Sequence, residues 1–434
     1  MQQVLLALLV ITLPFQFGRH FWPQYSYLFG LKVDYLSPTV YLQDILIVLL
    51  IFNRRKEFFF FLKKSLRLAA VYCLLLIGNI CFSLNPLVAF FAWLRVTELI
   101  LFGIFVAQNT KQIVFLLDKI LPFLLIFESV LGVWQVVRES SAGGLFWFFG
   151  ERSFNILTPG IARAVWQGKV FLRPYGTFSH PNSLSGFILL SLLLLFSKDK
   201  ISLLDKVAIV SGLILIILGF SRVIWLALFL LCLGCLLYYL LFKSCHGQLK
   251  LNFRYLFLLL YLPLMFFLFS RTEVQSQSYL MRQQLARVAL DSIRTHLLLG
   301  LGLNNFIINL GQNTAGWQWF YWLQPVHNIF LLAASETGLV GLAAFLFFLV
   351  LTVRRLFNCY IVTLLKKSKK QDSKIAIYQL SKLVGKKLFL LAALMVIMFT
   401  GLFDHYWLTL IQNQLLFTLF LGLSWGRQNA KITL

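Results

Sequence analysis

One histidine, His327, has a sequence context in which it could act as a proton acceptor in a reaction. His327 lies in the run Gln324-Pro325-Val326-His327-Asn328, directly after an aromatic segment and directly before a long apolar one. An imidazole titrates near neutral pH, so it can take a proton from a substrate hydroxyl. A lone histidine at such a position is more often a polar helix-start residue that makes one hydrogen bond. Its neighbours along the chain must therefore decide between the two interpretations.

Arginine is the second residue type that could carry chemistry. Guanidinium groups bind phosphate oxygens in bidentate fashion, which lysine cannot do. Packing and contact with lipid headgroups are the alternative explanation for them. The basic residues in segments that the topology below places outside the cytoplasm are Arg19, Arg138, Arg152, Arg163, Arg173, Arg222, Arg271, Arg282, Arg287 and Arg294, with only Lys32 and Lys169 beside them.

The composition indicates that these residues are carried by a membrane protein. Of the 434 residues 60% are hydrophobic and only 12% are charged, and the mean hydropathy is +0.83. Such a chain is too apolar for a soluble globular protein. About twelve apolar segments approach the ~20 residues that a spanning helix needs, without the alternation typical of barrel strands. We therefore predict an all-α polytopic protein with one transmembrane domain over residues 1–434.

The net charge of +24 could suggest a nucleic-acid partner, but its distribution favours membrane topology. Excess Lys and Arg mark cytoplasmic loops. With the amino terminus inside, basic clusters at 54–67 and 198–206 and a long basic stretch at 354–387 all fall in the cytoplasm. We therefore predict a multi-pass protein of the cytoplasmic membrane that contacts lipid and no nucleic acid.

Two predicted extracytoplasmic loops, 138–181 and 270–326, are much longer than the other connections. Both contain clusters of aromatic residues, which suit stacking on sugar rings but also mark membrane interfaces. Within the second loop, residues 279–298 have the apolar spacing of a helix that Gly300 and Gly302 would end. That helix, one of the short helices predicted in this loop, would place Arg282 and Arg287 near the membrane surface.

Ionisable residues also occur inside predicted spans. Asp44 lies in the second span, and Arg95 and Glu98 are three positions apart in the fourth, close enough to neutralise each other as a structural pair. Glu336 follows His327 by nine positions, which puts it on the opposite side of a helix. The acidic residues outside the membrane show no paired spacing for a metal ion, so we predict neither a metal nor a cofactor.

Four separated motifs carry a resemblance to a known family. The first is Arg173-Pro-Tyr-Gly-Thr-Phe-Ser-His180-Pro-Asn182, and the second is Ser221-Arg222. The third runs from Arg282 through His296 to Gly300, Gly302, Asn305 and Phe306. The fourth is His327-Asn328 followed by Gly338 and Gly341. In this order and spacing they resemble the O-antigen ligase and polymerase family of membrane glycosyltransferases. Asp404-His405-Tyr406-Trp407 and residues 41–45 are similar to the C-terminal and early regions of that family.

The resemblance implies a reaction at the extracytoplasmic or periplasmic face of a bacterial inner membrane. The donor would be a glycan on undecaprenyl pyrophosphate, and the acceptor a hydroxyl on a glycolipid, glycan or protein. It also implies that His327 is the general base and that Arg222 and Arg282 bind the pyrophosphate without a metal. Arg287, Arg173, His180 and Asn328 would contribute to substrate binding.

Two other functions remain open at this stage. A polymerase that joins lipid-linked repeat units would use the same donor and leaving group, although the His327 spacing favours a ligase. A lipid-linked glycan flippase would also bind pyrophosphate through arginines, but it would line a central cavity with its charges, whereas here they collect in the outside loops.

Overall fold

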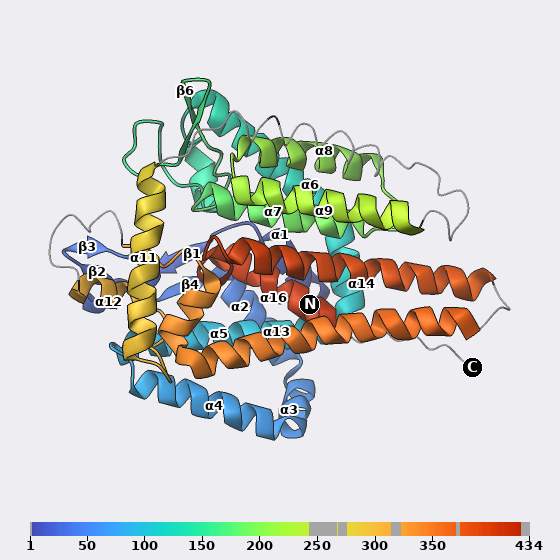
Figure 1. Cartoon of the computed structure of the whole chain (residues 1–434), viewed down its shortest axis with the longest axis horizontal. Coiled ribbons are helices and arrows are strands. Elements are labelled where there is room, and N and C mark those ends of the chain that lie inside the picture. Colours follow the sequence, from blue (N-terminus) through green and yellow to red (C-terminus); the bar gives the residue numbers. More distant parts are fainter. Residues whose placement is uncertain (1, 243–266, 268–275, 314–322, 370–373, 427–434) are drawn as a thin grey trace. The chain divides into compact units, whose positions relative to one another are not determined.

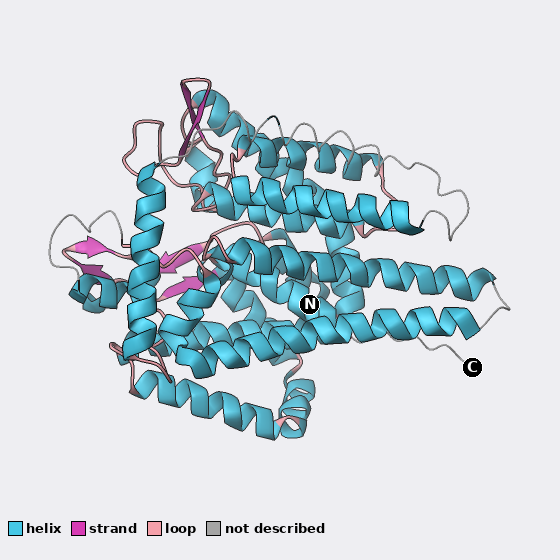
Figure 2. Ribbon diagram, viewed as in Figure 1, coloured by secondary structure: helices cyan, strands magenta, loops and turns pink. Residues whose placement is uncertain are grey.

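The computed structural model describes residues 2–242, 267, 276–313, 323–369 and 374–426, and these are mostly helical (Figure 2). The all-α prediction is thus confirmed as a class, although short strands that it did not include are also present. Contacts divide the chain into two compact units, 1–121 with 276–434, and 122–275, with the boundary at Pro122 inside helix α6 (Thr110–Arg138).

The first unit contains both ends of the chain (Figure 1). Its helices include α5 packed on α16, and α13 packed on α14. Its helical elements are α1 (Gln2–Ile11), η1 (Gln24–Ser26), η2 (Asp34–Leu36), α2 (Leu42–Asn53), α3 (Arg55–Lys64), α4 (Leu66–Cys81), α5 (Pro86–Gln108), α11 (Ser276–Thr295), α12 (Phe306–Asn313), α13 (Ile329–Lys369), α14 (Lys374–Gly401), α15 (Tyr406–Thr409) and α16 (Ile411–Trp425).

Two small antiparallel sheets lie between α1 and α2 of this unit. Strand β1 (Gly18–His20) pairs with β4 (Thr39–Tyr41), and β2 (Tyr27–Leu28) pairs with β3 (Leu31–Lys32). The tight turn of the second hairpin holds Phe29 and Gly30 at positive φ, as two-residue hairpin turns require.

Helix α11 lies in the predicted loop 270–326 and runs across the end of α13 (Figure 1). Its buried face, with Leu285 and Ala289, packs in one cluster with α12 and the start of α13. The helix ends at Thr295, before the predicted 298, because the carbonyls of Leu297 and Leu298 accept hydrogen bonds from Leu339 and Val340 of α13. The aromatic run 317–322 lies outside the described residues.

Helix α13 is broken at Gly338, whose φ is 67°. A Cβ there would lie 2.1 Å from the carbonyl oxygen of Leu298, so the position accepts only glycine. The backbone groups freed by the kink are satisfied by the segment after α11, since Leu301 and Gly302 donate to the carbonyls of Ser335 and Glu336. The glycine motifs at 300–302 and 338 thus form one backbone junction.

The buried side chain of Asn79 in α4 completes that junction. Its amide donates to the carbonyls of Leu299 and Glu336, and its oxygen accepts from Leu303 and from the Trp93 indole. All the hydrogen-bonding capacity of this polar side chain is used, which is what burial in an apolar helix requires.

The second unit holds the rest of α6 (Thr110–Arg138) and helices α7 (Pro181–Phe196), α8 (Leu203–Leu218) and α9 (Arg222–Phe242). The predicted loop 138–181 contains η3 (Gly144–Phe149) and an antiparallel hairpin of β5 (Arg163–Trp166) and β6 (Lys169–Leu172). The span predicted at 255–269 lies almost entirely outside the described residues.

The helices present apolar surface that suits lipid. By length and composition, two described helices could cross a membrane, Pro86–Gln108 and Ile329–Asn358, and six shorter ones are apolar. On α4 the side chains of Leu68, Val71 and Leu74 are 75%, 63% and 72% exposed. A soluble protein rarely leaves such a surface uncovered. The number of spans, about twelve by the ~20-residue criterion, stays a prediction.

Candidate active site

His327 lies two residues before Ile329, the first residue of α13. The Asn328 side chain caps α13 by accepting from the backbone N–H groups of Phe330 and Leu331, at 2.8 and 3.0 Å. Its amide nitrogen donates to the carbonyl of Leu402 at 3.1 Å. Asn328 thus fixes the residue beside it to the turn between α14 and α15, and its predicted contact with substrate stays a prediction.

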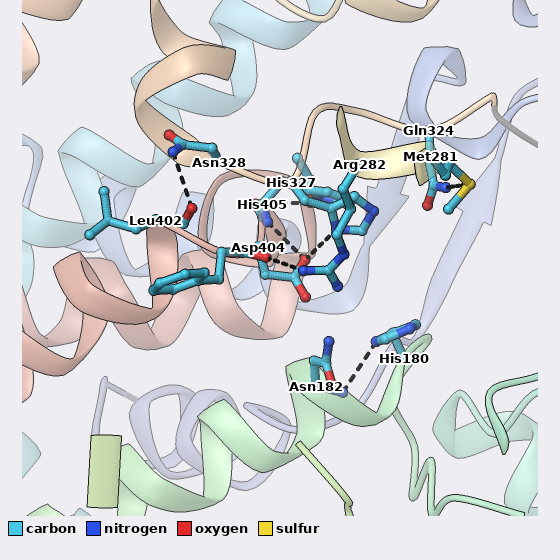
Figure 3. Close-up of polar contacts among 12 residues, drawn as sticks. His180, Asn182, Met281, Arg282, Gln324, His327, Asn328, Leu402, Asp404 and His405 are labelled. Carbon is cyan, nitrogen blue, oxygen red and sulfur yellow. Dashed lines mark hydrogen bonds and ion pairs between the residues drawn. The ribbon is translucent and has the colours of Figure 1, made fainter. Parts of the chain in front are cut away.

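Two elements of the first unit bring ionisable groups together around His327 (Figure 3). The turn between α14 and α15 supplies Asp404, whose Oδ1 lies 3.3 Å from His327 Nδ1. The same turn supplies His405, whose ring centroid lies 5.1 Å from that of His327. Helix α11 supplies Arg282, whose Nη1 donates to the carbonyl of Phe403 at 2.8 Å.

The contact with Asp404 determines which nitrogen of His327 can act. Asp404 Oδ1 also accepts from the backbone N–H of His405 at 2.9 Å, which fixes its orientation. A carboxylate beside Nδ1 favours the tautomer with the proton on Nδ1, which leaves the lone pair on Nε2. Among the described residues His327 Nε2 is buried and has no hydrogen-bond partner. This arrangement leaves one imidazole nitrogen available to accept a proton.

His405 is the neutral neighbour of this pair. Burial, followed by the positive charge of His327 when it is protonated and of Arg282, lowers the pKa of His405 to about 3, against the opposing effect of Asp404. Its Nδ1 lies 2.8 Å from the Thr409 hydroxyl. His405 therefore stays uncharged and does not compete with His327 for the Asp404 carboxylate.

His327, Asp404 and His405 could also hold a metal ion by type, since one ligand atom from each lies within 4.8 Å of the others. Imidazole and carboxylate are common ligands of transition metals. The guanidinium of Arg282 acts on the same cluster, and its positive charge opposes a divalent cation. The predicted absence of a metal is therefore a matter for experiment.

Arg282 and Arg287 occupy different faces of α11. Five positions separate them (287 − 282 = 5), which corresponds to about 140° around a helix. Arg282 is partly buried, whereas Arg287 is exposed. Arg282 is thus the one of the two that faces the His327 cluster.

Three predicted site residues, Arg173, His180 and Arg222, lie in the second unit. Arg173 donates to the carbonyl of Gly219 at 2.7 Å and to the side chain of Asn182 at 2.6 Å. It thereby ties the first motif to the turn that precedes α9. Arg222 is the first residue of that helix and is partly buried.

His180 serves as the N-cap of α7. Its Nδ1 accepts from the backbone N–H of Asn182 at 3.2 Å (Figure 3). This contact gives the motif a structural role at the start of α7. A contact of His180 or Arg173 with substrate stays a prediction.

Two buried polar residues of α6, which the sequence did not single out, hold the first motif in place. Gln135 accepts from the backbone N–H groups of Tyr175 and Gly176, and Glu128 accepts from the backbone and hydroxyl of Thr177. Gly176 has a φ of 56°, and a Cβ there would lie 2.2 Å from Glu128 Oε2. Polar residues within an apolar span are the sequence signal that could have identified them.

The predicted pair of Arg95 and Glu98 is confirmed at 2.8 Å. Asp44 joins it, since a second guanidinium nitrogen of Arg95 donates to Asp44 Oδ2 at 2.8 Å. Asp44 in turn accepts from the backbone N–H of Tyr41 at the start of α2. The cluster links α2 to α5.

Glu336 is likewise structural, because its carboxylate accepts hydrogen bonds from the Tyr35 hydroxyl and the backbone N–H of Phe306.

In the first unit, the His327 imidazole, the Asp404 carboxylate and the Arg282 guanidinium thus lie together, on a protein whose helices have apolar outer surfaces. Residues 207–346 match the family model described as O-Antigen ligase. No curated protein matched the chain. The matched stretch includes Arg222, Arg282 and His327 and ends before Asp404.

The match confirms the resemblance found in the motifs. It indicates an enzyme of the O-antigen ligase or polymerase type that acts with lipid-linked glycans and acceptors. Together with the two helices long enough to cross a bilayer, it also indicates an integral protein of a bacterial inner membrane.

Proposed function

We propose that the protein transfers a glycan from undecaprenyl pyrophosphate to an acceptor hydroxyl at the extracytoplasmic face of the membrane, without a metal ion. The observation that carries this proposal is the buried His327 Nε2, which has no partner among the described residues, with Asp404 holding the opposite nitrogen. A proton acceptor oriented in this way is what a general base requires.

In the proposed step the acceptor hydroxyl gives its proton to His327 Nε2 as its oxygen attacks the anomeric carbon. The bond from that carbon to the phosphate oxygen breaks on the opposite face, and undecaprenyl pyrophosphate leaves with the electron pair. Because Nε2 is buried, the acceptor must displace the groups around it when it binds. Asp404 stabilises the imidazolium that forms.

Positive charge near the leaving group is the second requirement of the step. Arg282 is the arginine that supports this role best, because it reaches the turn that carries Asp404. Fixed guanidinium donors stabilise the growing negative charge of a phosphate leaving group. Arg222 is proposed for the same role because it belongs to the serine-arginine motif, and Arg287 as a weaker ligand.

The ligase is preferred to the polymerase because of the His327 spacing in the fourth motif, and both use the same donor. A flippase has no need of an oriented proton acceptor, so the contact between His327 and Asp404 favours an enzyme. The three functions differ in the covalent products that they form.

The test is to incubate the purified full chain with a synthetic undecaprenyl-pyrophosphate oligosaccharide, with and without a glycolipid acceptor, in excess EDTA. A ligase yields glycosylated acceptor, and a polymerase lengthens the lipid-linked glycan without acceptor. A flippase yields no covalent product, and that result would contradict the proposal. Activity that EDTA removes and added divalent metal restores would contradict the metal-free mechanism.

A further inference from the structure

A second cationic site lies on α13, far along the helix from His327. Leu351, Arg354, Arg355 and Asn358 line an open cavity of about 470 Å³. Their spacing of i, i+3, i+4 and i+7 places them on one face of the helix. Arg354 follows the kink at Gly338 by 16 positions (354 − 338 = 16), about 24 Å along the helix at about 1.5 Å per residue, and it begins the basic stretch 354–387 that the predicted topology places in the cytoplasm.

The surroundings of Arg355 preorganise the cavity. Its guanidinium lies 4.9 Å from the centre of the Trp425 ring and donates to the Trp425 carbonyl at 3.3 Å, at the end of α16. Phe348 stacks on the same indole at 5.9 Å. A tryptophan and an arginine fixed together at helix ends are typical of the membrane interface. Arg354, in contrast, is exposed and has no side-chain partner in the described part of the chain.

The charge around the cavity is uniformly positive. The sequence contains no Asp or Glu between Glu336 and Asp372, and α16 contains none. Asp372 is the only acid from 354 to 387, a stretch whose basic residues are Arg354, Arg355, Lys366, Lys367, Lys369, Lys370, Lys374, Lys382, Lys386 and Lys387. Basic pockets between helices at the cytoplasmic surface attract anionic headgroups.

We propose that this cavity binds the phosphodiester headgroup of an anionic phospholipid, at the membrane face opposite to the His327 cluster. Arg354 and Arg355 would donate to the phosphate oxygens, the amide of Asn358 would complete the donors, and Leu351 would contact the start of an acyl chain. The site is independent of glycan transfer, so its test does not depend on the proposed reaction.

The experiment counts phospholipids retained by the purified full chain in native mass spectrometry after exchange into equal amounts of phosphatidylglycerol and phosphatidylcholine. Wild-type protein is expected to prefer phosphatidylglycerol. An arginine that contacts the bound anionic headgroup contributes about fivefold in affinity, so Arg354→Gln should weaken retention about fivefold and Arg354→Gln with Arg355→Gln about 30-fold. Arg354→Gln alone leaves the contact of Arg355 with α16 intact.

Arg67→Gln, which removes an exposed arginine of α4 on the same predicted side, is the matched control and should retain phosphatidylglycerol as wild type does. Equal loss in Arg67→Gln and Arg354→Gln, or equal retention of the two lipids by wild type, would overturn the proposal. Displacement of the lipid by millimolar glycerol phosphate would also overturn it, because the ligand would then be a soluble phosphate.

Discussion

The chemistry of the site depends on which nitrogen of His327 holds its proton, and Asp404 is the residue that decides this. An Asp404→Asn variant can donate as well as accept, so the tautomer is no longer fixed. We expect its kcat for glycan transfer to fall by about 10²- to 10⁴-fold with little change in KM. Asp404→Glu should recover part of the loss. A variant that lost only stability would show neither the selective fall in kcat nor the rescue.

Replacing Arg282 by lysine separates the contribution of the guanidinium geometry to transfer from that of its positive charge. Arg282→Lys keeps the positive charge but loses the planar fork that can hold Phe403 and phosphate together. Transfer should fall by at least about tenfold. The control is Arg294→Lys on the same helix, where the arginine is exposed and pairs only with Asp291 in the contacts observed. Equal activity of the two variants in the transfer assay would reduce the role of Arg282 to charge alone.

The lowered pKa of His405 predicts how the stability of the protein changes with pH. Its pKa in the folded protein is lowered from 6.5 to about 3, mainly by burial, so the unfolded chain binds the proton more readily. The free energy of unfolding should therefore fall as pH drops from 6.5 toward 3, by at most about 1.4 kcal/mol per pH unit. Thermal unfolding in detergent across this range measures it. His405→Gln should flatten the dependence, and an unchanged slope would show that other groups cause it.

At the scale of elements, the kink of α13 sets the direction of the first part of that helix. It therefore also sets the position of His327, which precedes it. Gly338→Ala would force a left-handed conformation and a clash with Leu298. The strained conformation alone costs about 1–3 kcal/mol, and the clash adds to it, so the thermal unfolding midpoint should fall clearly.

Gly30→Ala is the matched control for that prediction. Gly30 also has positive φ, at 78°, but a Cβ there meets nothing within 4 Å. Its destabilisation should be limited to the conformational strain. If the thermal unfolding midpoints of the two variants fall by the same amount, the close contact between α13 and the segment after α11 does not contribute to stability.

The elements were predictable to different degrees, for physical reasons. Helix α11 followed from its apolar spacing, because helix periodicity is local. Its end did not, since Leu297 and Leu298 leave the helix to bond residues of α13 about forty positions later. The β1–β4 and β2–β3 hairpins were not predicted, because two or three residues per strand are too few for an alternation to register.

At the scale of the whole molecule, the residues that complete the site come from distant parts of the sequence. His327 and Asp404 are 77 positions apart, and Asn79 reaches Glu336 across 257. The motifs identified His327 and Arg282 individually. Their partners could not be identified, because a single sequence carries no record of which distant side chains meet.

The family match spans parts of both compact units, since 207–275 lies in one and 276–346 in the other. Of the matched motif residues, Arg222 thus lies in the second unit and His327 in the first. Within the first unit, a turn beyond the matched stretch supplies Asp404 and His405.

The most direct test of the central claim is glycan transfer by His327→Ala, purified and reconstituted beside His296→Ala. His296 lies in the same unit and contacts the neighbouring Thr295, so its replacement should leave transfer unchanged. The account predicts that His327→Ala is expressed and inserted normally yet loses transfer by about 10²- to 10⁴-fold. Transfer at the wild-type rate in that variant would contradict the assignment of His327 as the base.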